Sequence, residues 1–168
     1  MNVRQRLFIL SWVVLSCVGV DQFTKWIATG ELRGKGMTAY LGDFFRLQYS
    51  ENPGAFLSLG AGLSNDSRFW FLTVLVGGVL VAAGAYLLMA QKISKLSVHA
   101  LAWTVAGGMS NLIDRAFRDN GAVVDFMNVG IGSLRTGIFN VADMAIMAGV
   151  ALLVLDLGKE AKEEKARV

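Results

Sequence analysis

Two aspartates in the C-terminal third of the chain could form a reactive centre. Asp125 lies in the motif Val-Val-Asp-Phe, and Asp143 lies in Phe-Asn-Val-Ala-Asp, within an apolar run long enough to cross a membrane. An ionisable side chain at membrane depth is energetically costly, and where one occurs it usually serves a function. Two carboxylates that come close together cannot both ionise easily, so one holds a proton as an acid while the other acts as a base. The pair therefore predicts acid–base chemistry at one end of a membrane bundle.

The rest of the chain offers few other reactive groups. The single cysteine, Cys17, has no second thiol with which to form an internal disulfide, and no cluster of cysteine and histidine has the spacing of a metal site. The single histidine, His99, falls at the opposite end of its apolar run from the predicted site. We therefore expect water to be the nucleophile of any hydrolysis, and we expect no metal and no cofactor.

The elements that must position the two aspartates are predicted to be membrane-spanning helices. The chain has 168 residues, of which 54% are hydrophobic and 17% are charged. Residues 69–90 carry no charged side chain, and about 20 apolar residues are enough to cross the hydrocarbon layer. The predicted fold class is an α-helical integral membrane protein, with residues 1–168 forming a single membrane-embedded domain. The four predicted transmembrane helices cover about residues 7–28, 68–90, 96–116 and 136–156.

Basic residues favour one orientation of these helices. Four spans place both termini on one side, together with Arg4, Arg6 and the short turn that contains Lys92 and Lys95. Basic residues accumulate on the cytoplasmic side of membrane proteins, so both termini are predicted to be cytoplasmic. The net charge of +3 is assigned to these ends, and no nucleic-acid partner is expected. A cleaved signal peptide is the alternative for the first span, but its apolar run continues past the weak cleavage motif at Cys17.

Two longer segments, residues 29–67 and 118–135, are predicted on the non-cytoplasmic side. In the first, aromatic residues lie before and after Asn52-Pro53-Gly54. Such a pattern around a turn indicates a short β-hairpin, here over residues 43–59. Its aromatic content favours packing against the membrane surface over a fully solvated loop.

Polar residues from three predicted helices fall at one depth in the membrane. At a rise of 1.5 Å per residue they lie roughly 3–10 Å beneath the outer surface. Lys25 can pair with an aspartate one turn before it, and Arg115 directly follows another. Two interpretations stay open: the residues form a functional site, or their charges neutralise each other and hold the bundle together. The residues at this depth are Asp21, Asn111, Asp114 and Asp143.

Five short motifs, taken in chain order, resemble those of the lipoprotein signal peptidase (signal peptidase II) family. Each motif is weak alone, but together they cover essentially the whole chain at membrane positions. The motifs are Val20-Asp21-Gln22-Phe23-Thr24-Lys25, Glu51-Asn52-Pro53-Gly54-Ala55-Phe56, Gly107-Gly108-Met109-Ser110-Asn111-Leu112-Ile113-Asp114-Arg115, Val123-Val124-Asp125-Phe126 and Phe139-Asn140-Val141-Ala142-Asp143.

The resemblance implies an aspartyl endopeptidase of the bacterial inner membrane. Such an enzyme removes the signal peptide of a prolipoprotein by cutting before the cysteine that carries diacylglyceryl. The implied partners are the lipid-modified prolipoprotein and membrane lipid. Separately, we expect the protein to be a monomer. The implied architecture adds a β-cradle and an active site near the periplasmic face. By the same resemblance, Asp125 and Asp143 form the catalytic dyad, and the residues that bind substrate or support the site are Asp21, Lys25, Asn52, Gly54, Asn111, Asp114, Arg115 and Asn140.

The residues also suggest roles for the groups around the dyad. Asn111 and Asn140 are expected to orient a carboxylate or the substrate through hydrogen bonds. Arg115 is expected to hold a substrate carbonyl or a lipid phosphate, or only to pair with Asp114. The shared proton belongs to the pair, so the sequence assigns base and acid to neither aspartate.

Two other functions compete with peptide cleavage. A small proton-coupled transporter would use Asp21, Asp114 and Asp143 as a relay, but the inner half of the predicted bundle holds almost no ionisable group. A structural scaffold subunit would tolerate asparagine in place of either aspartate of the dyad.

Overall fold

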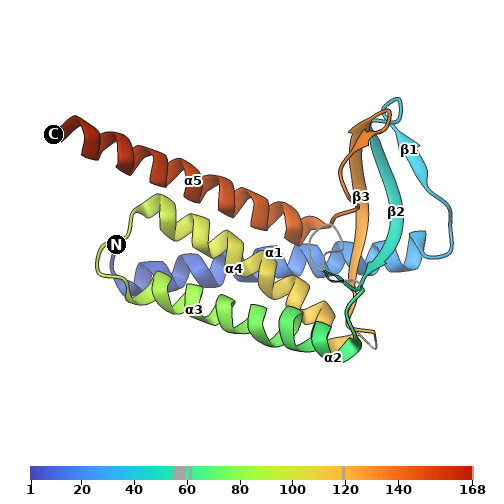
Figure 1. Cartoon of the computed structure of the whole chain (residues 1–168), viewed down its shortest axis with the longest axis horizontal. Coiled ribbons are helices and arrows are strands. Elements are labelled where there is room, and N and C mark those ends of the chain that lie inside the picture. Colours follow the sequence, from blue (N-terminus) through green and yellow to red (C-terminus); the bar gives the residue numbers. More distant parts are fainter. Residues whose placement is uncertain (55–59, 61, 119, 168) are drawn as a thin grey trace.

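A bundle of long helices with a small sheet across one end makes up the protein. The computed structural model describes residues 1–54, 60, 62–118 and 120–167, and Figure 1 shows the sheet standing across the direction of the helices. The helical elements are α1 (Val3–Leu32), α2 (Asn65–Arg68), the π-helix η2 (Phe69–Leu75), α3 (Val76–Met89), α4 (Lys95–Phe117) and α5 (Val141–Arg167). The strands are β1 (Thr38–Tyr40), β2 (Phe45–Asn52), β3 (Val123–Ile131) and β4 (Leu134–Arg135).

Three helical stretches are long and apolar enough to cross a membrane, judged by length and composition. They are Val3–Leu32, the continuous stretch Asn65–Met89, and Val141–Glu163. The 23-residue α4 packs against α1, α3 and α5, and polar residues interrupt its apolar sequence, so it is not among these three stretches. Large apolar side chains such as Phe8 and Trp26 face outward from α1, as lipid-facing residues do. The predicted class, a helical membrane protein with a small antiparallel sheet, is confirmed.

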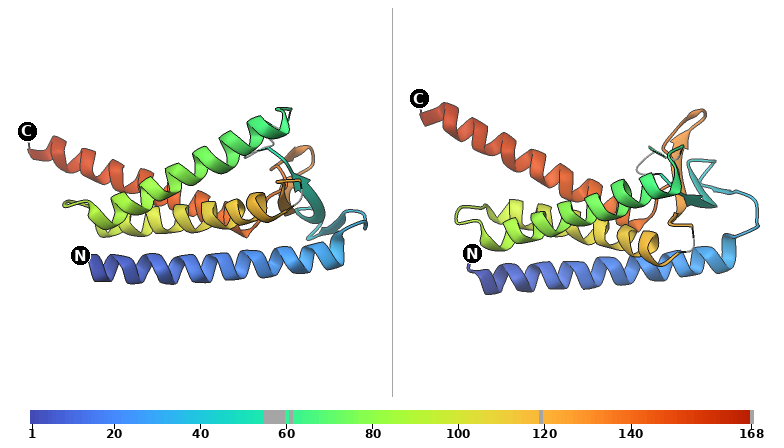
Figure 2. Two further views of the ribbon diagram at one scale, coloured as in Figure 1. Left: turned by 90° about the horizontal axis from the view of Figure 1, so that it is seen from below. Right: turned by 60° about the horizontal axis from the view of Figure 1, so that its bottom comes forward.

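Both termini lie at the end of the bundle opposite the sheet, as the two views in Figure 2 show. The chain therefore crosses the length of the bundle four times. A cavity and the sheet occupy the other end, where α4 finishes and α5 begins. This arrangement agrees with the prediction that both termini share one side.

Close packing of α4 against α5 depends on small residues. An added Cβ at Gly149 would lie 2.6 Å from the carbonyl oxygen of Ala100, and one at Gly107 would clash with the carbonyl oxygen of Ala142. Glycine lets helix backbones approach closely where lipid supplies no hydrophobic driving force between helices. The approach brings the start of α5, with Asp143, against the outer half of α4.

The four strands form one antiparallel sheet in the order β1-β2-β3-β4. In β2 and β3, Asn52 pairs with Val123 and Ser50 pairs with Asp125, with an irregularity between Leu47 and Ser50. The first residues of β3 are buried against the helices. The sheet thereby carries Asp125 from a loop position in the sequence to the open end of the bundle.

Two local predictions differ from the structure. The strand at residues 45–52 exists, but it pairs with β1 and β3, and the expected second arm at residues 55–59 lies outside the described residues. The last helix begins at Val141 instead of near Thr136. The intervening segment is extended because Phe139 exchanges backbone hydrogen bonds with Met127 of β3. Asp143 consequently lies in the first turn of its helix.

The packing of α4 against α5 predicts opposite effects for two glycines of α5. Gly149→Ala should lower the free energy of unfolding by about 1–3 kcal/mol, because the new methyl group overpacks a closed contact. Gly158→Ala is the matched control, since nothing lies within 4 Å of an added Cβ there. The control should leave stability unchanged or raise it by up to about 1 kcal/mol. Thermal unfolding in detergent measures both, and equal midpoints for the two variants would contradict this packing.

Candidate active site

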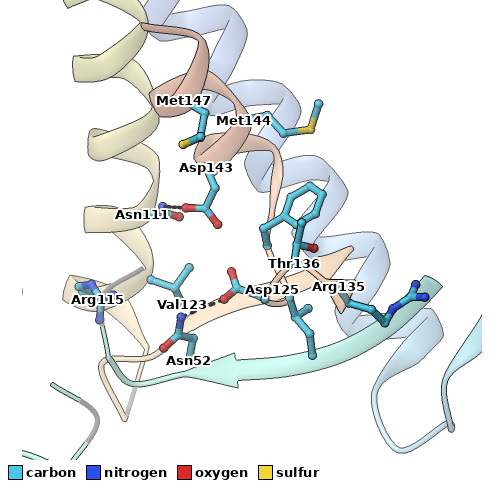
Figure 3. Close-up of a pocket in the computed structure, with 13 residues that line it drawn as sticks. Asn52, Asn111, Arg115, Val123, Asp125, Arg135, Thr136, Asp143, Met144 and Met147 are labelled. Carbon is cyan, nitrogen blue, oxygen red and sulfur yellow. Dashed lines mark hydrogen bonds between the residues drawn. The ribbon is translucent and has the colours of Figure 1, made fainter. Parts of the chain in front are cut away.

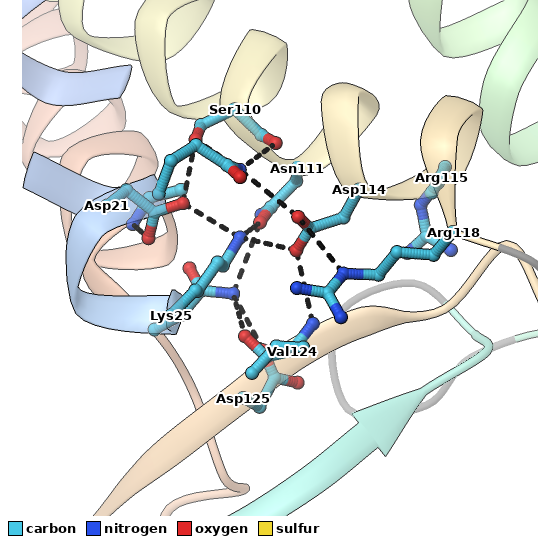
Figure 4. Close-up of polar contacts among 12 residues, drawn as sticks. Asp21, Lys25, Ser110, Asn111, Asp114, Arg115, Arg118, Val124 and Asp125 are labelled. Carbon is cyan, nitrogen blue, oxygen red and sulfur yellow. Dashed lines mark hydrogen bonds and ion pairs between the residues drawn. The ribbon is translucent and has the colours of Figure 1, made fainter. Parts of the chain in front are cut away.

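A buried lysine joins the carboxylates of two helices (Figure 4). The ammonium of Lys25 lies 2.8 Å from the Oδ2 of Asp21 and 2.9 Å from the Oδ2 of Asp114. The exposed fractions of the three side chains are 0%, 0% and 2%. A buried charge is tolerated when it is paired and hydrogen-bonded, and here one cation faces two anions. Arg118, 3.4 Å from the Oδ1 of Asp114, supplies a second positive charge at the edge of this group.

Each of these carboxylates also holds the backbone next to a dyad aspartate. The Oδ1 of Asp21 accepts the backbone N–H of Ala142 at 2.8 Å, one residue before Asp143. The Oδ2 of Asp114 accepts the backbone N–H of Val124 at 3.2 Å, one residue before Asp125. The lysine and its two partners therefore fix the segments that carry both dyad aspartates.

Asp143 is held at the N-terminus of α5 by a reciprocal pair of hydrogen bonds with Asn140. The backbone N–H of Asn140 donates to the Oδ2 of Asp143 at 3.1 Å, and the backbone N–H of Asp143 donates to the Oδ1 of Asn140 at 2.9 Å. This is the capping-box arrangement, with an anionic side chain in the positive first turn of a helix. The Nδ2 of Asn111 donates to the other carboxylate oxygen at 2.8 Å.

Asp125 is held from two sides by side-chain amides. The Nδ2 of Asn140 donates to its Oδ1 at 2.7 Å, and the Nδ2 of Asn52 donates to its Oδ2 at 3.1 Å. Burial raises the pKa of Asp125 to about 7, with a further rise from the nearby charge of Asp143. The two amide donors act in the opposite direction and lower it. Asp125 thus retains a proton in a pH range where an exposed aspartate is fully ionised.

A chain of contacts connects the lysine to the dyad. Lys25 donates to the Oδ1 of Asn111 at 2.8 Å, and that oxygen also accepts the Nδ2 of Asn140 at 3.1 Å. With its oxygen facing a cation, the amide of Asn111 must present its nitrogen to Asp143. The orientation of both asparagine side chains is therefore set by the network, and together they touch both aspartates.

Both aspartates line one cavity of about 480 Å³ beneath the sheet (Figure 3). Asn52, Asn111 and Arg115 contribute polar groups to its wall. The opposite wall is apolar and open toward the outside of the bundle, because Met144 and Met147 of α5 are 54% and 59% exposed. The remaining lining residues are Val123, Arg135, Thr136, Gly137, Ile138 and Phe139.

Arg115 contacts backbone carbonyl oxygens, and not the side chain of its neighbour Asp114. Its guanidinium donates to the carbonyl oxygens of Pro53 at 3.5 Å, of Gly121 at 3.3 Å and of Gly54. Among the contacts of the described residues, Asp114 pairs with Lys25 and Arg118 and not with Arg115. Gly54 is placed by this contact and by its backbone N–H, which donates to the Oδ1 of Asn52 at 3.0 Å. Arg115 therefore fixes the turn after β2 at the rim of the cavity.

The structure brings all ten predicted site residues into one connected region, with the dyad at the cavity and Asp21, Lys25 and Asp114 behind it. Sequence reasoning missed Arg118, which contacts Asp114, and two residues that donate hydrogen bonds within the network. The Oγ of Ser110 donates to Asp21 at 2.7 Å, and the Nε2 of Gln22 donates to Asp114 at 3.1 Å. Ser110 and Gln22 both lie within the motifs quoted from the sequence. Their position near an ionisable residue on the same helix is the signal that could have identified them. The cavity residues 135–139 gave no comparable signal, because only the pairing with β3 places them.

Comparisons with known proteins agree with this geometry. Residues 13–159 match the family described as signal peptidase (SPase) II. The lipoprotein signal peptidase of Sphingopyxis alaskensis is 40% identical over 154 residues, which cover 88% of this chain and 86% of that protein. The one from Bacillus subtilis is 31% identical over 156 residues, covering 90% and 97%.

Two solved structures share the fold. A bacterial membrane enzyme determined at 2.3 Å resolution has a TM-score of 0.76 and 25% identity, covering 95% of this chain and 90% of that one. A second, determined at 1.9 Å, has a TM-score of 0.72 and 27% identity, covering 91% and 92%. The transporter alternative finds no support in these relatives. The chain belongs to the signal peptidase II family of membrane aspartic endopeptidases, which remove the signal peptides of prolipoproteins.

Proposed function

We propose that Asp125 and Asp143 are the catalytic dyad, and that they activate water to cut a prolipoprotein before its diacylglyceryl-modified cysteine. The observation that carries this proposal is the shared cavity, which presents two differently held carboxylates beside an apolar wall open to lipid. A peptide backbone needs the polar side of such a cavity, and the acyl chains of a modified cysteine need the apolar side.

We assign the base to Asp143. Its carboxylate lies in the first turn of α5 and accepts the backbone N–H of Asn140, so the helix terminus favours its ionised form. The amide of Asn111 adds a donor whose oxygen faces the Lys25 ammonium, which strengthens that hydrogen bond. Asp125 lies at no helix terminus, and it accepts no hydrogen bond from the Asn111 amide, whose oxygen faces Lys25. The proton shared by the pair therefore resides on Asp125.

The reaction then balances in two steps. Asp143 removes a proton from a water molecule while the oxygen of that water attacks the scissile carbonyl carbon. At the same time Asp125 transfers its proton to the carbonyl oxygen. The resulting tetrahedral intermediate collapses when the leaving nitrogen takes the proton from Asp143. Asp125 regains a proton from the intermediate as the carbonyl re-forms. Asp143 ends ionised and Asp125 protonated, so the dyad returns to its starting state.

The surroundings of the dyad fit the proposed topology. With both termini cytoplasmic, the cavity lies at the periplasmic end of the inner membrane, where the diacylglyceryl group of a substrate already resides. Arg115 positions the turn at Pro53 and Gly54 over the peptide, since its guanidinium donates to the backbone carbonyl oxygens of both residues. A single chain contains the whole cavity, and the proposed active form is the monomer in membrane lipid.

Replacement of either dyad residue tests the assignment. Asp125→Asn and Asp143→Asn should each lower kcat/KM by about 10²–10⁴-fold, because each removes one proton-transfer group. The assay is cleavage of a diacylglyceryl-modified prolipoprotein by purified enzyme, with folding checked by thermal unfolding. Glu31→Gln, at an exposed carboxylate on the last turns of α1, is the matched control and should retain activity. Full activity in either asparagine variant would rule out the dyad.

The raised pKa of Asp125 predicts an alkaline limit to activity. Catalysis needs this carboxyl protonated, so kcat/KM should fall as the pH rises through about 7. Asn52→Ala removes a donor that stabilises the ionised form, and the pKa of Asp125 and the alkaline limit should both move to higher pH. A pH profile of kcat/KM for both proteins measures this. A limit that moves to lower pH, or that does not move, would contradict the assignment of the proton to Asp125.

A role of the buried Lys25 network in turnover can be distinguished from a role in stability alone. Lys25→Met leaves two buried carboxylates without their cation and should cost about 3–5 kcal/mol of stability. Combining it with Asp21→Asn and Asp114→Asn removes the unpaired charges, so the thermal midpoint should recover. Turnover should stay low in the triple variant, because Asn111 no longer faces a cation. Recovery of full turnover would show that the network only holds the bundle together.

A further inference from the structure

The end of the sheet farthest from the helices consists of two neighbouring turns. One joins β1 to β2 and the other joins β3 to β4, and both lie at the top of the sheet in Figure 1. The backbone N–H of Gly130 donates to the carbonyl oxygen of Phe44 at 2.9 Å, which joins the two turns directly. We refer to residues 40–45 and 130–135 together as the sheet tip.

The sheet tip exposes large apolar side chains outside the helix bundle. Leu134 is 84% exposed, Leu41 79% and Ile131 78%, while Tyr40 and Phe44 are nearly half exposed. Scattered apolar residues are ordinary on protein surfaces, but a contiguous group usually marks an interaction site. These residues come from two turns that a backbone hydrogen bond joins, so the exposed side chains gather at one end of the sheet.

The turns that carry these side chains are tied in place. The guanidinium of Arg135 donates to the carbonyl oxygens of Asp43 at 2.8 Å and Phe44 at 3.4 Å, and its Nε donates to Asn128 at 2.6 Å. Leu41 has a φ of 52°, a conformation that is uncommon and costs energy for a leucine. The turn therefore holds an exposed leucine at some energetic cost, which is consistent with a role for this side chain.

Charge and position favour a lipid surface as the partner. The sheet tip holds one carboxylate, Asp43, and one arginine, Arg135, and Arg46 follows it in β2. Asp43 is paired with Arg46 at 2.6 Å and with Arg135 at 3.7 Å, so it presents little free negative charge. An apolar surface without free negative charge suits the interface of a bilayer.

The sheet runs across the helix direction at the level where α4 ends and α5 begins (Figures 1 and 2). The sheet tip therefore extends sideways along the membrane surface and does not project away from it. At the same end of the bundle, the cavity-lining Met144 and Met147 of α5 are 54% and 59% exposed, so apolar side chains face outward there as well.

We propose that the sheet tip inserts Leu41, Ile131 and Leu134 into the outer interface of the bilayer. This contact anchors the free end of the sheet, with the cavity enclosed between the anchored sheet and α5. The anchor goes beyond the proposed function, because it needs only the fold and the lipid and holds in a catalytically inactive protein.

An environment-sensitive fluorophore on Leu134→Cys, in a Cys17→Ala background, tests the insertion. The labelled protein is placed in vesicles of phosphatidylethanolamine and phosphatidylglycerol. Nitroxide-bearing lipid should quench the label several-fold more strongly than it quenches a label on Lys35→Cys, and aqueous iodide should show the reverse order. Lys35 is the matched site because it is 64% exposed and lies in the turn before β1. Equal iodide access at both sites would overturn the proposal.

Two further results decide between lipid and other partners. A label at position 134 that is shielded in native membranes, but open to iodide in the pure lipid vesicles, would assign the tip to a protein partner and overturn the proposal. A double variant, Leu41→Asn with Leu134→Ser, should expose a label on Ile131→Cys to iodide. Asparagine is chosen because it tolerates positive φ. Continued shielding of that label would show that the two leucines do not anchor the tip.

Discussion

The contact between Lys25 and two buried carboxylates is the constraint on which the site depends. Removing three charges from water is unfavourable, and the arrangement is tolerable only while the cation and both anions stay together. The contact joins α1 to α4, and the same two carboxylates accept backbone N–H groups of β3 and α5. Four elements distant in sequence therefore have one relative position in which every buried charge is satisfied. That position is also the one that brings the dyad to a single cavity.

The two aspartates of the dyad differ because their environments differ. Asp143 receives a helix N-terminus and a lysine-backed amide, whereas Asp125 lies on a strand and receives two neutral amides. Asn140 touches both, since its backbone contacts one carboxylate and its side chain the other. Separate environments for two carboxylates at short range are the usual way in which proteins divide acid and base roles. Neutral amides accomplish this without adding a charge to the cavity.

Much of this site could be predicted from sequence, for identifiable reasons. Helical spacing placed Asp21 one turn from Lys25, and equal depth grouped Asp114 and Asn111 with them, because helix rise and membrane thickness are fixed lengths. The motifs that resemble the family supplied the dyad. Strand pairing is non-local, so the sequence did not reveal that β3 places Asp125 beside Ser50 of β2, or that the segment before Asn140 pairs with β3. The contacts of Arg115 could not be chosen from the alternatives for a similar reason, since the turn at Pro53 and Gly54 comes from a distant part of the chain.

The central claim is that the dyad holds one proton and that it resides on Asp125. Infrared spectroscopy of the C=O band of the protonated carboxyl group, recorded just below neutral pH, tests this most directly. The band is compared between variants that each remove the asparagine side chain donating to one of the two aspartates. Asn52 donates to Asp125 and Asn111 donates to Asp143. The account predicts that the band shifts in Asn52→Ala and keeps its position in Asn111→Ala. A band that shifts only in Asn111→Ala would place the proton on Asp143 and contradict the account.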